Sequence, residues 1–155
     1  MVVVSSLSSY NAMSHTDIIR LTSADAATTE AISRLLKQLT STPIDFTESF
    51  LESIIAEGNA IFVLRKEGEV VGMLTVGSYS SPTGRKAWIE DVVVDSAHRG
   101  KGYGRVLVEH AIEYVRTLSP CTLMLTSNPS RIAANELYRN SGFEQKITNV
   151  YKMTL

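Results

Sequence analysis

The sequence predicts a mixed α/β fold in which helices cover the faces of a β-sheet. Short runs of β-branched and apolar residues are bounded by turn residues, which is typical of strands. Longer segments carry apolar residues at helical spacing, which is typical of helices that pack on a sheet. The longest of these helices follows a strand and a glycine-rich turn. We expect the order β-α-α-β-β-β-α-β-α-β in one domain at residues 17–155 of the 155-residue chain.

The domain is expected to begin with one strand and two helices. Residues 17–21 (DIIRL) are apolar and β-branched and favour a strand. Thr22-Ser23 is the expected cap of a helix over residues 24–39, because hydroxyl groups accept hydrogen bonds from the free N–H groups at helix starts. A second apolar stripe predicts a helix over residues 47–57, which Gly58 is expected to end.

A hairpin and a further strand are expected next. Residues 60–65 (AIFVLR) and 70–79 (VVGMLTVGSY) favour two strands joined by a tight turn. Residues 80–86 have the composition of a loop. Residues 87–94 favour a strand that leads directly into the glycine-rich turn.

The C-terminal half is expected to alternate helices and strands. An apolar face that runs from Tyr103 to Leu118 predicts the long helix. Residues 121–126 (CTLMLT) favour a strand, and residues 131–140 favour a short helix capped by the preceding Ser-Asn-Pro-Ser run. Residues 143–155 alternate enough to favour one or two final strands.

Composition excludes several classes of protein. The net charge is −1, whereas general nucleic-acid binders carry a basic excess. No apolar run approaches the roughly 20 residues that span a bilayer. The single cysteine, Cys121, permits no intrachain disulfide, which fits a reducing, cytoplasmic environment. Residues 1–16 lack the charged start of a secretory signal and are expected to form a poorly ordered leader.

The glycine-rich turn has the chemistry of a phosphate site. It reads Arg99-Gly100-Lys101-Gly102-Tyr103-Gly104 and opens the long helix. The first N–H groups of a helix have no partner, and the helix dipole places partial positive charge there. Glycines let an anion approach this backbone without a Cβ in the way.

The spacing of the glycines argues against two common nucleotide sites. A dinucleotide site needs G-x-G-x-x-G after the first strand, but here the pattern is G-x-G-x-G after the fourth. A P-loop needs G-x-x-x-x-G-K-[ST], but Lys101 is not followed by Ser or Thr, and the spacing of the glycines differs. A connector without a ligand remains the alternative on this turn alone.

A second motif downstream identifies a resemblance. The turn matches the pattern [QR]-x-x-G-x-[GA], and residues 135–143 (NELYRNSGF) look like an N-x-x-x-[FY]-Y-x-x-x-G-F-type element. Together and in this order they resemble the GNAT superfamily of acyl-CoA-dependent N-acyltransferases, from about Asp17 onward. The resemblance implies a twisted mixed sheet of six to seven strands flanked by about four helices. It also implies a V-shaped split between the fourth and fifth strands, and acetyl-CoA as co-substrate without a metal.

The resemblance also implies how acetyl-CoA is held. The pyrophosphate would lie on backbone N–H groups of the turn, and the pantetheine arm would bond to the backbone of Val92 and Val94 in the split. A bulge in this strand would aim an N–H at the thioester oxygen. The cofactor-binding residues implied are Val92, Val94, Arg99, Gly100, Lys101, Gly102, Tyr103, Gly104, Asn128 and Asn135.

Three side chains are candidates for the chemistry. Tyr138 matches the family tyrosine that protonates the leaving thiolate as general acid. Glu90 and Asp91 are adjacent in a strand, so they are expected on opposite faces with one of them facing the split. We expect Glu90 to act as base or to bind the amine, although pairing with a neighbouring strand would also explain a carboxylate here. Asn128 fits a helix cap or turn residue equally well.

The sequence leaves the acceptor open between a small primary amine, an amino sugar, and a peptide or protein amine. The IEDVVV run resembles glucosamine-6-phosphate N-acetyltransferases, and Arg85 and Lys86 are candidates for binding such a phosphate. The segment after residue 124 departs from that subgroup, because it lacks an acidic stretch. Residues 40–45 are a candidate substrate loop, although such a loop taken alone is more often an inert connector.

Two further expectations concern class and assembly. A non-catalytic acyl-CoA sensor or interaction module is the alternative to an enzyme, but such a binder needs neither Tyr138 nor Glu90. Members of this superfamily often form homodimers through their C-terminal strands. Residues 143–155 are therefore the expected dimer edge.

Overall fold

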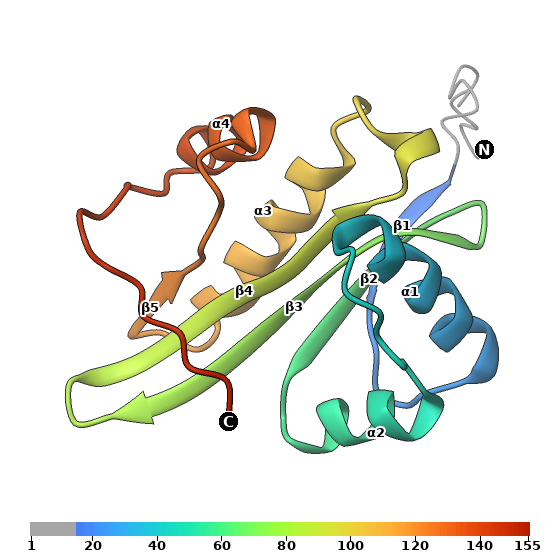
Figure 1. The fold of residues 1–155 in the computed structure, drawn as a ribbon, viewed down its shortest axis with the longest axis horizontal. Helices are drawn as coiled ribbons and strands as arrows, with labels where there is room; N and C mark the ends of the chain where they lie inside the picture. The colour runs from blue at the N-terminus through green and yellow to red at the C-terminus, as the bar shows by residue number, and fades with distance from the viewer. Residues whose placement is uncertain (1–14) are drawn as a thin grey trace, which may run out of the picture.

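The computed structural model describes residues 15–155 and is built around a five-stranded β-sheet. The strand order is that of the sequence, and neighbours pair antiparallel except for the last pair, which is parallel (Figure 1). The strands are β1 (Thr16–Arg20), β2 (Ala60–Lys66), β3 (Glu69–Ser81), β4 (Gly84–Val94) and β5 (Cys121–Met124). The predicted α/β class is therefore confirmed, as a GNAT-like mixed sheet.

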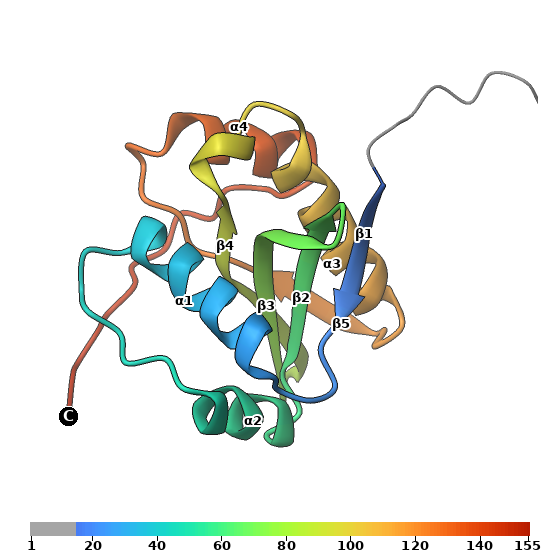
Figure 2. The same ribbon diagram turned by 90° about the vertical axis from the view of Figure 1, so that its right-hand side faces the viewer.

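Four α-helices cover the two faces of this sheet. They are α1 (Ala26–Leu39), α2 (Glu48–Ala56), α3 (Tyr103–Arg116) and α4 (Ile132–Asn140), with a 3₁₀ turn at Ser96–His98 before α3. Helices α1 and α2 lie on one face, and α3 lies on the other with α4 beside it (Figures 1 and 2). The helix number that the resemblance implied agrees with this arrangement.

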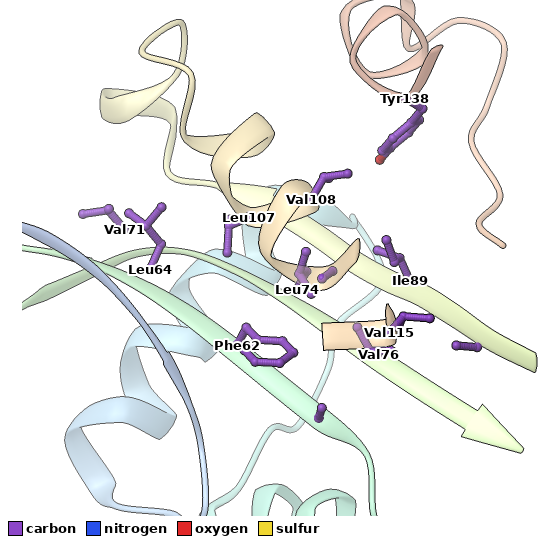
Figure 3. Packing of buried hydrophobic residues seen from close by; sticks show 13 residues of the cluster. Phe62, Leu64, Val71, Leu74, Val76, Ile89, Leu107, Val108, Val115 and Tyr138 are labelled. Carbon is purple, nitrogen blue, oxygen red and sulfur yellow. The ribbon is translucent and has the colours of Figure 1, made fainter. Parts of the chain in front are cut away.

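Each face of the sheet carries its own apolar core. Alternate residues of β2 point to opposite faces, so Phe62 and Leu64 join the cluster under α3, while Ile61 and Val63 join the cluster under α1. A strand with both faces covered reads as a continuous apolar run, as β2 does from Ala60 to Leu64. Figure 3 shows the α3-side cluster, which also includes Tyr138 of α4.

Helix α1 begins two residues later than predicted. Its N-cap is Asp25, whose carboxylate accepts from the backbone N–H of Thr28 at 2.8 Å and from its hydroxyl at 2.7 Å. The prediction of Thr22-Ser23 as cap is wrong, because a carboxylate also interacts favourably with the helix dipole. Helix α2 begins as predicted, with the Thr47 side chain accepting from Phe50 N.

The β3–β4 hairpin is longer than predicted, so residues 80–86 are largely strand rather than loop. Strand β4 already begins at Gly84, and Ser81 pairs with it across a tight turn. The Lys86 ammonium donates to the hydroxyls of Ser81 at 2.6 Å and Thr83 at 2.7 Å. These bonds stabilise the turn. The prediction of a loop rested on the Ser, Pro, Thr and Gly residues that dominate this stretch.

The C-terminal segment differs most from the prediction. Residues 143–155 form no strand, so the described part of the chain has five strands instead of six to seven. Apolar side chains of this segment are exposed, among them Ile147, Tyr151 and Met153. Alternation was a weak signal here, because a strand also needs a neighbour with which to pair. The homodimer through this segment stays a prediction.

A side-chain clamp joins α1 to the segment that follows β4. The Gln38 amide donates to the Asp95 carboxylate at 3.1 Å, and its carbonyl accepts from Ser96 N at 2.8 Å. The Asp95 carboxylate also accepts from Ala97 N at 2.9 Å, so Asp95 is held both by Gln38 and by its own loop. The clamp fixes the approach to the glycine-rich turn.

Replacing Gln38 with leucine should lower the free energy of unfolding by about 1–2 kcal/mol, because two hydrogen bonds of a partly buried amide are lost. Chemical denaturation measures the change. The matched control is Lys37→Leu, an exposed neighbour outside the clamp, which should change stability by less than about 0.5 kcal/mol. Equal effects of the two substitutions would contradict the clamp.

Candidate active site

Strands β4 and β5 separate partway along their length. They pair in parallel from Arg85↔Cys121 to Trp88↔Met124, and β4 then continues for six residues to Val94 without β5. Backbone groups on this side of β4 are therefore free of strand partners from Ile89 onward. This is the V-shaped split between the fourth and fifth strands that the resemblance implied.

A β-bulge interrupts β4 at the split. Met73 of β3 pairs with Val93 and Thr75 pairs with Glu90, so Asp91 and Val92 together oppose the single residue between Met73 and Thr75. Asp91 has φ +54°, a left-handed conformation that is unusual for a residue other than glycine. The bulge turns the local backbone and changes which way the next side chains point.

A cavity of about 400 Å³ lies at the split and reaches under α1 and α2. Its lining includes residues of the link between the first two helices, which was predicted as a candidate substrate loop. The lining residues are Ile32, Leu36, Leu39, Thr40, Ile44, Phe46, Phe50, Ile54, Ile61, Met73, Thr75, Ile89, Glu90, Asp91, Val92, Leu125, Thr126, Arg131 and Tyr138.

Both predicted carboxylates line this cavity. The expectation that Glu90 and Asp91 point to opposite faces rested on the strict alternation of a strand, which the bulge interrupts here. Burial raises the pKa of Asp91, and burial together with the neighbouring Asp91 charge raises the pKa of Glu90. Both side chains still touch solvent, so the apolar walls around them desolvate them only in part.

Tyr138 reaches the same cavity from α4. Its side chain is only 8% exposed, and its ring packs edge-on against Phe143 with centroids 6.2 Å apart. Burial raises the pKa of the Tyr138 hydroxyl, and the nearby Arg131 charge partly opposes the shift. A phenol with a raised pKa keeps its proton at neutral pH and can therefore donate it. In Figure 3 the hydroxyl points away from α4, toward the sheet.

The glycine-rich turn lies between β4 and α3. Gly100 (φ +74°) and Gly102 (φ +80°) are left-handed, and an added Cβ at either would meet nothing within 4 Å. Gly102 is the N-cap of α3, whose first N–H groups therefore have no side-chain partner. Arg99 bends back to donate to the Val94 carbonyl at 3.0 Å. The turn thus presents an open, glycine-lined helix start.

The two asparagines and the basic pair lie outside the cavity lining. Asn128 accepts from Ser130 N at 2.9 Å, and Asn135 donates to the Asn128 carbonyl at 2.9 Å, so both hold the loop that enters α4. Arg85 and Lys86 lie near the hairpin end of β4. Arg85 is about 16 Å along the strand from Glu90, at roughly 3.3 Å per residue. Contact of these four residues with ligands stays a prediction.

Two features of the site have no counterpart in the sequence-based expectations. Arg131 lines the cavity next to Tyr138, although its position at the start of a short helix gave no hint of a role. The Ser127 hydroxyl is buried without a hydrogen-bond partner among residues 15–155, and it directly follows the cavity-lining Thr126. Neither Arg131 nor Ser127 could be predicted as a site residue from the sequence, because their positions depend on where β5 stops pairing with β4.

Residues 15–155 contain neither a membrane-spanning helix nor a cluster of metal-binding side chains. No helix in this range is long and apolar enough to cross a membrane. No group of three or more His, Cys, Asp or Glu side chains in the same range is arranged to hold a metal ion.

The split sheet, the bulge and the glycine-rich turn are the arrangement of the GNAT fold. The chain belongs to the acetyltransferase (GNAT) family, whose model matches residues 29–143. A solved structure of a putative acetyltransferase from Agrobacterium tumefaciens str. C58 superposes with a TM-score of 0.73 at 26% identity, over 89% of this chain and 99% of that one.

Named relatives within the family act on different acceptors. Streptothricin acetyltransferase of Streptomyces lavendulae is 34% identical over 88 residues, which are 57% of this chain and 46% of that protein. Glucosamine 6-phosphate N-acetyltransferase 1 of Oryza sativa subsp. japonica is 30% identical over 122 residues, 72% of each chain. This chain therefore spans a little under half of the first relative's length.

Proposed function

We propose that this protein transfers an acetyl group from acetyl-CoA to a primary amine in a ternary complex. The observation that carries the proposal is one cavity at the β4–β5 split that gathers Glu90, Asp91 and Tyr138. Two carboxylates attract and deprotonate an amine, and a protonated phenol can protonate a leaving group. Family membership supports the class of reaction.

The described residues fit acetyl-CoA. The open helix start at Gly100 and Gly102 suits the pyrophosphate, and the edge of β4 at Val92 and Val94, which pairs with no strand on this side, suits the amide-bearing arm. The Val94 carbonyl already accepts from Arg99, so its N–H is the group left for the arm. The buried Ser127 hydroxyl adds a polar group at the β5 side. Bound there, acetyl-CoA supplies an acetyl thioester. This fit supports Val92, Val94, Gly100 and Gly102 as cofactor-binding residues, and contact of acetyl-CoA with the other predicted residues stays a prediction.

The side chains divide the proton transfers between them. An acceptor that arrives as an ammonium first loses one proton to solvent, and Glu90 takes the proton that the attacking amine loses, directly or through water, while Asp91 helps to hold the positive charge. The new C–N bond forms as the C–S bond breaks, and Tyr138 gives its proton to the departing sulfur. Arg131 stabilises the phenolate that remains until the Tyr138 proton is replaced. No covalent acetyl-enzyme is needed.

The pH dependence of kcat/KM should reflect the ionisation of Glu90 and the influence of Asp91 on it. Glu90 must be unprotonated to act, and its pKa is raised, so kcat/KM should fall as the pH drops through a value above the ordinary range of glutamate. Asp91→Asn removes a neighbouring negative charge, so the acid limb should move to lower pH. The amine's own ionisation cancels when one amine is used for both proteins. An acid limb that stays in place would contradict the assignment to Glu90.

Release of the CoA thiol in the presence of a panel of amines tests the proposal as a whole. We expect release above the rate of hydrolysis with at least one amine. The opposite result is that CoA raises the melting temperature of the protein while no amine promotes release of the thiol. That outcome would identify a non-catalytic acyl-CoA-binding module.

A further inference from the structure

We infer that the acceptor is an amine that carries an apolar group, rather than a phosphorylated or polyhydroxylated amine. The inference rests on the proposed function and adds the substrate class. In this arrangement the amino group meets Glu90 and Asp91, and the apolar group lies between the sheet and the α1–α2 segment. Both carboxylate residues and residues of the α1–α2 segment line the same cavity.

The part of the cavity lining that comes from α1, α2 and their link is apolar except for Thr40. This apolar wall includes Leu36 and Leu39 of α1, Ile44 and Phe46 of the link, and Phe50 and Ile54 of α2. An acceptor covered with hydroxyl groups would lose hydrogen bonds to water here without replacing them. An apolar group would gain contact and release water.

Two of these wall residues are large, apolar and still exposed. Phe50 is 48% exposed and Ile44 is 42% exposed, although most apolar residues of their size in this chain are in the core. Phe50 and Phe46 meet edge-on with ring centroids 5.8 Å apart. A pair of aromatic rings at the rim of a cavity provides a surface on which a bound ring or alkyl chain can pack.

The charges of the cavity favour a cation and offer little to a phosphate. Among its lining residues, Glu90 and Asp91 are negative and Arg131 alone is positive. Arg131 stands on the α4 side beside Tyr138, away from the α1–α2 wall. The predicted phosphate binders Arg85 and Lys86 are outside the lining, and Lys86 is engaged by Ser81 and Thr83.

Paired amines isolate the contribution of the apolar wall. 2-Phenylethylamine and ethanolamine share an aminoethyl group and differ only in a ring or a hydroxyl. We expect kcat/KM for 2-phenylethylamine to exceed that for ethanolamine by about tenfold to a hundredfold, because the ring is removed from water. D-glucosamine and glucosamine 6-phosphate should be poorer than 2-phenylethylamine.

Phe50→Ala should reduce the preference for 2-phenylethylamine by about fivefold or more, mainly through KM, and should change kcat/KM for ethanolamine little. The matched control is Tyr79→Ala, since Tyr79 is 51% exposed but belongs to the β3–β4 hairpin and does not line the cavity. This control should leave the preference at its wild-type value.

The outcomes separate the two proposals. Turnover that favours glucosamine 6-phosphate or ethanolamine would overturn the apolar class and leave the acetyltransferase intact. Turnover of no amine would overturn the acetyltransferase. Calorimetric titration of 2-phenylethylamine into the CoA-bound protein then decides the inference: binding that Phe50→Ala weakens supports an apolar-amine site, and the absence of binding overturns it.

Discussion

Replacement of Tyr138 with phenylalanine is expected to lower kcat by about a hundredfold or more, because the leaving sulfur loses its proton donor. CoA affinity should stay within about threefold of wild type, since the turn and the edge of β4 are untouched. KM for the amine should also change little, because the carboxylates remain. Steady-state thiol release and calorimetric titration with CoA measure the two quantities.

The same substitution should scarcely affect folding. The Tyr138 ring packs against Phe143 and stays in the α3-side core when only the hydroxyl is removed. We expect the free energy of unfolding to change by less than about 1 kcal/mol. Tyr114→Phe is the matched control. Tyr114 of α3 also packs its ring in the core, with its centroid 5.3 Å from that of Phe62, but it does not line the cavity. A Tyr138→Phe enzyme with wild-type kcat would remove Tyr138 from the chemistry.

Replacement of Gly102 with valine is expected to weaken CoA binding by at least about a hundredfold. Gly102 has φ +80°, which a β-branched residue adopts only with strain of about 1–2 kcal/mol. Its new side chain would also stand in the open space at the start of α3 where a phosphate is proposed to bind. Wild type should gain about 2.7 kcal/mol of stability at a CoA concentration of 100 times its Kd, and the variant almost none.

Gly58→Val is the control that introduces backbone strain without altering the proposed phosphate site. Gly58 has φ +86° at the end of α2, and an added Cβ there also meets nothing within 4 Å. Both variants should therefore lose similar intrinsic stability, while only Gly102→Val should lose the stabilisation by CoA. If CoA stabilises both variants as much as wild type, the phosphate does not bind at this turn.

Local sequence signals located most helices and strands of this fold. The apolar stripe of α3 and the β-branched runs of β2 and β3 are strong because each element buries a full face or stripe. The prediction of strands in the final segment was wrong for the opposite reason. Alternation in residues 143–155 was visible, but strand formation depends on a pairing partner that no local pattern specifies.

The candidate site could be predicted only in part. The sequence motifs located Tyr138 and the glycine-rich turn, because family resemblance fixes their register. They could not show that Glu90 and Asp91 share one cavity, since that depends on a bulge opposite β3. The apolar wall contributed by Phe50 and Ile44 was equally hidden, because residues far apart in sequence meet only when α1 and α2 pack on the sheet.

The most direct test is a single-turnover reaction of excess protein with acetyl-CoA and 2-phenylethylamine, followed by mass spectrometry of both the amine and the intact protein. The expected result is an amine that gains the mass of one acetyl group at a rate that Tyr138→Phe lowers strongly, with no change in the mass of the protein. Acetate in place of the amide, or an acetylated protein that forms before the amide, would contradict direct transfer to an amine at the split of β4 and β5.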